Sequence, residues 1–148
     1  MANDKLTSLI SYLNKNDMSE FETLSPKQKA RCVYKHFCDY YSFQEKSYKA
    51  KNQVDKDRFD VEIERHFSLA MGQLKSLSQL ELGEYLSLIV SKLQSVIQQS
   101  NQDKLISNKM IFGTIIRQIP EQLNIENQST FQSLKNLYDE FENEIIKQ

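Results

Sequence analysis

Glycine and proline are scarce in this sequence, since its 148 residues include only three glycines and two prolines. Strand-rich folds change direction often, and their turns depend on these two residues. Leucine, glutamine, lysine, glutamate and serine are abundant instead, and most of these residues form helices readily. The composition therefore predicts an all-α protein.

Long apolar runs are also missing. The most apolar segment, residues 110–116, is far shorter than the roughly 20 residues that span a bilayer. The first residues lack the basic segment and apolar run of a signal peptide. Cys32 and Cys38 are six positions apart and would point in different directions on one helix, so we expect no disulfide between them. These absences predict a cytoplasmic protein that does not bind membranes.

Neither sign of charge dominates. The chain has 19 lysines and arginines against 20 acidic residues, a net charge of −1. This balance excludes a protein that coats nucleic acid with its whole surface. Its 26% of charged and 39% of hydrophobic residues are typical of an ordinary folded protein. We expect a single helical domain over residues 1–148.

Apolar residues recur every three or four positions, which places them on one face of a helix. The pattern predicts five to six helices in an antiparallel bundle, some longer than 20 residues. Several stripes have a period near 3.5 residues, which also suits a homodimer. The stripes occupy residues 6–13, 30–41, 59–77, 82–97, 105–119 and 131–145.

Helix ends have their own signals. A serine followed three residues later by Gln or Glu forms a capping box, and such pairs occur at 25–28, 78–81 and 129–132. Residues 99–103 and 124–129 are polar and rich in asparagine, so we expect loops there. Residues 44–58 contain good helix formers but almost no apolar stripe. They form either a projecting helix or a mobile loop, and we favour the helix.

Positive charge gathers in residues 26–58. This segment holds nine of the 19 lysines and arginines and four acidic residues, which gives it a charge of +5 (9 − 4). It also contains six of the 15 aromatic residues. Lysine and arginine can neutralise phosphates, and exposed aromatic rings can stack on unpaired bases. The alternative is a helix with one solvated and one packed face.

These features favour a small, non-catalytic helical protein that binds another macromolecule. Its partner would be nucleic acid or an acidic protein surface, and the protein would be of the inhibitor, immunity or accessory-subunit type, encoded by a phage or plasmid. We expect no cofactor. The expected contact residues are Lys27, Arg31, Lys35, Tyr40, Lys46, Tyr48, Lys49 and Lys51.

The alternative function is enzymatic. Residues 31–36, RCVYKH, contain an arginine and a histidine with four residues between them. This spacing resembles the R-x4-6-H element of HEPN-type ribonucleases, which are small helical proteins that dimerise. The resemblance implies that Arg31 and His36 would polarise a scissile phosphate and assist attack by the 2′-hydroxyl. No metal would be needed.

Metal-binding pairs are present at helical spacing, although no standard zinc motif occurs. Cys32 and His36 are four residues apart, as are Glu62 and His66 on the next expected helix. Two antiparallel helices could bring these four side chains to one zinc ion. Such pairs are common in helical chains, so we expect no metal site. Nucleotide-binding loops and nucleophile elbows are also absent from the sequence.

Overall fold

The structure is a computed structural model, and it describes residues 20–99 and 102–147. All regular elements in these two ranges are helical, which confirms the all-α prediction. The α-helices are α2 (Pro26–Lys49), α3 (Gln53–Ser76), α4 (Gln79–Gln99), α5 (Gln102–Gln118) and α6 (Gln128–Lys147). Two short 3-10 helices, η1 (Pro120–Gln122) and η2 (Ile125–Asn127), connect α5 to α6. The helix expected over residues 6–13 lies outside the described residues.

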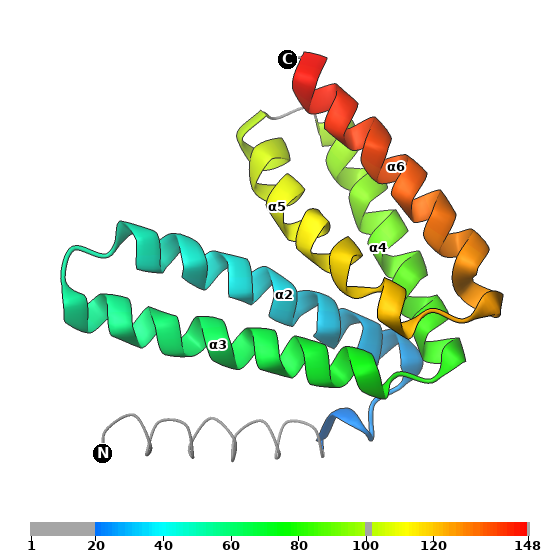
Figure 1. Ribbon diagram of the computed structural model, residues 1–148, viewed down its shortest axis with the longest axis horizontal. Coiled ribbons are helices and arrows are strands. Elements are labelled where there is room, and N and C mark those ends of the chain that lie inside the picture. Colours follow the sequence, from blue (N-terminus) through cyan, green and yellow to red (C-terminus); the bar gives the residue numbers. More distant parts are fainter. Residues whose placement is uncertain (1–19, 100–101, 148) are drawn as a thin grey trace. The chain divides into compact units, whose positions relative to one another are not determined.

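The chain divides into two compact units, residues 1–76 and 77–148. In the first unit, α2 and α3 pack against each other as an antiparallel hairpin (Figure 1). Most of its buried apolar residues belong to the stripes that the spacing predicted, and Phe21 and Leu69 are buried in addition. The buried apolar residues are Phe21, Ala30, Val33, Phe37, Leu69, Ala70 and Leu74.

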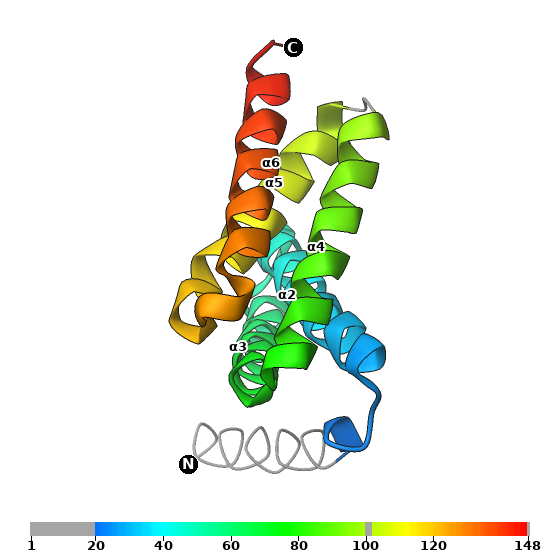
Figure 2. The same cartoon turned by 90° about the vertical axis from the view of Figure 1, so that its right-hand side faces the viewer.

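The second unit contains three α-helices. Figures 1 and 2 show α5 antiparallel to both α4 and α6, while α4 and α6 run in the same direction. All three helices contact one another. Phe112 of α5 and Phe141 of α6 meet edge to face, with their ring centroids 6.3 Å apart, and both residues are completely buried. Leu82, Tyr85, Leu86, Ile89 and Leu93 of α4 complete this core with Ile115, Ile116, Ile119 and Leu134.

Two of the three expected capping boxes are present. The Ser25 hydroxyl accepts from the Gln28 backbone N–H, and the Gln28 side chain accepts from the Ser25 N–H. Ser78 and Glu81 make the same reciprocal pair at the start of α4. The box expected at 129–132 is wrong, because α6 already begins at Gln128 and Ser129 is helical. Asn124 instead caps η2 by accepting from the Asn127 N–H.

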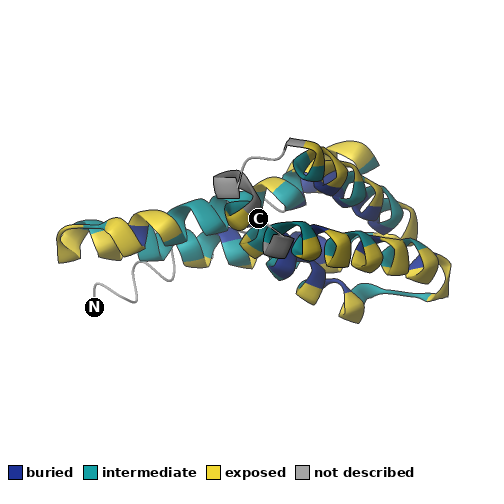
Figure 3. Cartoon of the chain, turned by 90° about the horizontal axis from the view of Figure 1, so that it is seen from above, coloured by how far each residue is buried: buried dark blue, intermediate teal, exposed yellow. Residues whose placement is uncertain are grey.

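Residues 44–58 contain the end of α2, a short turn and the start of α3. Ala50 has an extended backbone and ends α2, and the Asn52 side chain accepts from the Asp55 N–H at the start of α3. Figure 3 shows exposed residues concentrated at this end of the hairpin. The segment is therefore the tip of a helical hairpin, in which the Ala50 N–H donates to the Ser47 carbonyl and the Asn52 side chain caps the start of α3.

Ser47 and Asp60 tie the two helices together near this tip. The buried Ser47 hydroxyl donates to Asp60 Oδ1 at 2.5 Å, and Lys56 pairs with Oδ2 at 3.0 Å. The hydrogen bond from Ser47, followed by that from Lys56, lowers the pKa of Asp60. Both contacts favour the charged carboxylate.

Replacing Ser47 with alanine should therefore raise the pKa of Asp60 toward the value of an exposed aspartate. A Lys56→Gln variant should also raise the pKa of Asp60, because it removes the lysine's hydrogen bond and its favourable charge. Side-chain carboxyl NMR shifts followed against pH measure both values. An unchanged pKa in Ser47→Ala would contradict the cross-helix hydrogen bond.

No helix in the described ranges is apolar enough over a sufficient length to cross a lipid bilayer.

Candidate functional site

The α2–α3 hairpin carries both groups of residues that the sequence singled out. On α2, five exposed cations fall within an arc of about 100°, because each residue turns the helix by about 100°. We call this set the basic flank: Lys27, Arg31, Lys35, Lys46 and Lys49. At about 1.5 Å of rise per residue, the flank extends for about 33 Å along α2.

The flank is not neutralised by neighbouring carboxylates of the described chain. Elsewhere in the hairpin, Lys56 pairs with Asp60 and Arg65 pairs with Glu62. None of the five flank cations takes part in an ion pair with a described residue. Lys46 does lie over the Phe43 ring, 4.9 Å from its centroid. The positive charge of the flank therefore faces solvent.

The expected aromatic contacts separate into two environments. Tyr48 is 90% exposed near the tip, beside Lys49. Tyr40 faces α3, where its ring lies 5.1 Å from that of Phe67 and its hydroxyl accepts from Gln44. Lys51 is exposed in the turn between the helices. Tyr48 and Lys51 can therefore reach a partner together, whereas Tyr40 belongs to the hairpin interface.

The structure does not bring Arg31 and His36 together. Five residues apart on α2, their side chains leave the helix axis in directions about 140° apart. Arg31 is exposed on the basic flank, while His36 faces α3. The arginine–histidine pair implied by the ribonuclease resemblance is therefore not assembled within one chain.

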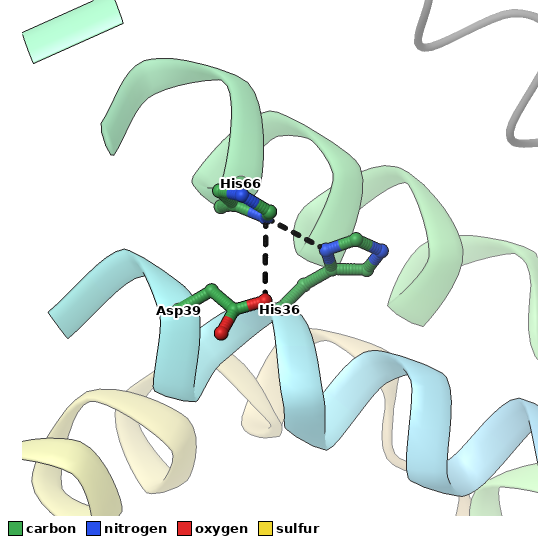
Figure 4. A group of neighbouring side chains, drawn as sticks. All are labelled: His36, Asp39 and His66. Carbon is green, nitrogen blue, oxygen red and sulfur yellow. Dashed lines mark hydrogen bonds and ion pairs between the residues drawn. The ribbon is translucent and has the colours of Figure 1, made fainter. Parts of the chain in front are cut away.

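His36 contacts His66 of α3 instead, as Figure 4 shows. The Nδ1 atoms of the two rings are 2.9 Å apart, and the rings are tilted by 35°. His66 Nδ1 also lies 3.9 Å from Asp39 Oδ2. These are the two histidines of the chain, separated by 30 residues in sequence. One ligand atom from each of His36, Asp39 and His66 can be chosen so that all three lie within 4.8 Å of one another.

His66 is held firmly in this cluster. It is 8% exposed, and the Phe43 ring stacks on it with an interplanar angle of 11°. Its other ring nitrogen, Nε2, lies 3.4 Å from Glu62 Oε2 and 3.5 Å from Arg65 Nη1. Burial lowers the pKa of His66, and the nearby Asp39 carboxylate opposes this shift. The net effect of burial is to favour the neutral imidazole of His66 over the charged form.

A pocket of about 350 Å³ opens on the cluster. His36, Asp39 and His66 line it together with Cys32 and Gln73. Gln73 is 1% exposed, and its side-chain oxygen has no hydrogen-bond partner in the described chain. No disulfide joins Cys32 to Cys38. The pocket thus combines accessible imidazole and carboxylate groups with an unsatisfied buried oxygen.

The sequence indicated part of this cluster. Helical spacing pairs Cys32 with His36 and Glu62 with His66 as candidate ligands, and His36 and His66 do meet across the hairpin. Asp39 was missed, although its position three residues after His36 on α2 places both on one helix face. Glu62 lies behind His66 on the Nε2 side, rather than beside His36.

Comparisons of this chain with protein-family models, with curated proteins and with solved structures gave no match.

Proposed function

We propose that this protein is a non-catalytic helical binding protein whose basic flank contacts the phosphate backbone of single-stranded nucleic acid. The observation that carries the proposal is the solvent-facing row of five cations without internal carboxylate partners. A regular row of cations releases counterions from a nucleic-acid strand, and this release supplies binding free energy without any base contact.

The residues within the arc of the flank favour phosphates over a protein partner. Cys38, Ser42 and Glu45 fill the arc between Lys35 and Lys46, and none of them supplies a large apolar side chain. Glu45 is the one acid in this arc, and its carboxylate accepts from the Tyr41 hydroxyl. Protein interfaces usually need a desolvated aromatic or apolar centre to bind tightly. A phosphate backbone needs only positioned cations.

Tyr48 and Lys51 extend the proposed surface at the hairpin tip. A fully exposed tyrosine beside cations can stack on an unpaired base, an interaction worth about 1–3 kcal/mol per base in proteins that bind single strands. Tyr48 is 90% exposed, so its ring is available for such stacking. In this proposal, Tyr40 supports the hairpin instead of contacting the strand.

The same proposal includes a cellular setting. The protein would act in the cytoplasm with both thiols reduced, as an inhibitor, immunity protein or accessory subunit of a mobile genetic element. It would act as a homodimer. Light scattering that gives twice the chain mass of 17.4 kDa would support the dimer, and a monomer mass would remove it.

A charge-neutralised variant tests the contact. We expect a triple variant to bind a fluorescently labelled single-stranded RNA more weakly than the unmodified protein. The variant combines Lys27→Gln, Arg31→Gln and Lys35→Gln. With two of five contacts left, the slope of log affinity against log salt should change from about −3.5 to about −1.4. Fluorescence anisotropy at several salt concentrations measures this slope.

The chain offers a matched control. The control is a second triple variant, which removes two lysines and one arginine that are exposed but lie off the flank. It combines Lys75→Gln, Arg117→Gln and Lys135→Gln. The control should bind RNA as the unmodified protein does. Equal losses in both variants would show a nonspecific charge effect, and no RNA binding at all would favour an acidic protein partner. Cleavage of the RNA would favour the ribonuclease alternative.

A further inference from the structure

We infer that His36, Asp39 and His66 form a binding site for a divalent transition-metal ion, with zinc the expected ion. The inference is independent of the proposed nucleic-acid contact, because these residues lie off the basic flank. It departs from the sequence expectation of no metal site. Two imidazoles and one carboxylate are a donor set that binds zinc in proteins and leaves one coordination position open.

The distances fit an ion after small side-chain movements. Zinc bonds of about 2.0–2.1 Å in tetrahedral geometry place neighbouring ligand atoms about 3.3 Å apart. The corresponding distances are 2.9 Å between the two Nδ1 atoms and 3.9 Å from His66 Nδ1 to Asp39 Oδ2. All three side chains come from adjacent helices of one hairpin, and one ligand atom from each lies within 4.8 Å of the others (Figure 4). We expect rotation of the His36 and Asp39 side chains to close the site around an ion.

The surroundings of His66 match those of a metal ligand. Metal-bound histidines usually donate their second ring N–H to a carboxylate, which fixes the tautomer that leaves the other nitrogen free to bind. Glu62 Oε2 lies 3.4 Å from His66 Nε2 and can accept that proton. Stacking by Phe43 fixes the orientation of the ring. Glu62 is therefore assigned as the positioning residue, and His66 Nδ1 as the ligand atom.

Burial and access also suit an ion. In the metal-free cluster, the two Nδ1 atoms at 2.9 Å must share one proton, because one ring must donate and the other accept. An ion between them would replace this proton and satisfy both nitrogens along with the Asp39 carboxylate. The pocket of about 350 Å³ gives the ion a route from solvent and leaves room for a water ligand. The unpartnered oxygen of Gln73 lines the same pocket and can accept from that water.

Isothermal titration of zinc into the untagged, full-length protein tests the site. The background should be Cys32→Ser, Cys38→Ser, so that the two thiols cannot bind the ion. We expect one zinc per chain in this background. His36→Gln or Asp39→Asn should weaken binding by at least about 100-fold, and Glu62→Gln by about 10- to 100-fold, the usual effect of losing such a carboxylate.

Two controls separate a metal site from a structural cluster. Glu64→Gln changes an exposed acid on the same helix, and it should leave zinc affinity unchanged. Helix content measured by circular dichroism must be equal in all variants. In the cysteine-free protein, the ring NMR signals of both histidines should shift when zinc is added. Since the chain has no further histidine, these signals are unambiguous.

The site is overturned if the cysteine-free protein binds no zinc, or binds it equally well after Asp39→Asn and His36→Gln. Either result would mean that the cluster only joins α2 to α3. Because the zinc titration contains no RNA, its failure would leave the nucleic-acid proposal untouched.

Discussion

Replacing Phe141 with alanine is expected to lower the free energy of unfolding by about 3–5 kcal/mol, as truncation of a buried phenylalanine usually does. Phe141 is fully buried on α6 and meets the equally buried Phe112 of α5 edge to face. The substitution removes this ring contact and leaves a cavity between helices that close packing cannot refill.

Chemical denaturation followed by circular dichroism measures this loss, and a thermal scan should show a midpoint about 6–20 °C lower. Ile125→Ala is the control, because Ile125 is 87% exposed and its truncation should change stability by no more than about 0.5 kcal/mol. A loss below about 1 kcal/mol in Phe141→Ala would contradict the packing of α6 against α5.

The same experiment tests the prediction of a single domain. The chain contains two compact units, with Phe141 in the second. If residues 1–148 unfold as one cooperative domain, all of the helical signal should disappear in one shifted transition. If part of the helical signal is instead lost at the midpoint of the unmodified protein, the α2–α3 hairpin unfolds separately.

Raising the salt concentration from 50 to 200 mM is expected to weaken RNA binding by about 100-fold. This estimate follows from a slope of about −0.7 per phosphate contact on a single strand and from the five cations of the basic flank. Each of these cations is exposed, so each can approach a phosphate without first breaking an internal ion pair.

Anisotropy titrations with labelled single-stranded RNA at four salt concentrations measure the slope. Tyr48→Ala should lower affinity at every salt concentration while leaving the slope unchanged, because stacking releases no counterions. An affinity independent of salt would contradict the phosphate contact, even if the protein retained RNA.

Much of the fold could be predicted because helix formation here depends on local patterns. Ser25 and Gln28 cap α2 with atoms three residues apart, and Pro120 follows soon after α5 ends. The cap expected at Ser129 failed for a local reason too. Asn124 and η2 satisfy the backbone groups ahead of α6, so the helix begins one residue before that serine.

Less of the candidate sites could be predicted. The row of cations on α2 follows from helical periodicity alone, so the sequence was sufficient to expect it. The environment of Tyr40 was not, because its packing on Phe67 depends on how α3 docks. The same docking brings His36 to His66 and adds Asp39, a residue that no recognised metal motif marks.

The amino-acid sequence by itself determined the helical class, most helix positions and the gathering of positive charge on one side of α2, since each depends on residues within a few turns of one another. Only the tertiary structure decided which of the chemically capable side chains meet. Two histidines 30 residues apart become neighbours because the turn at residues 50–52 reverses the chain and sets the register of α3 on α2. That register depends on the packing of whole helix faces, which no short sequence pattern specifies.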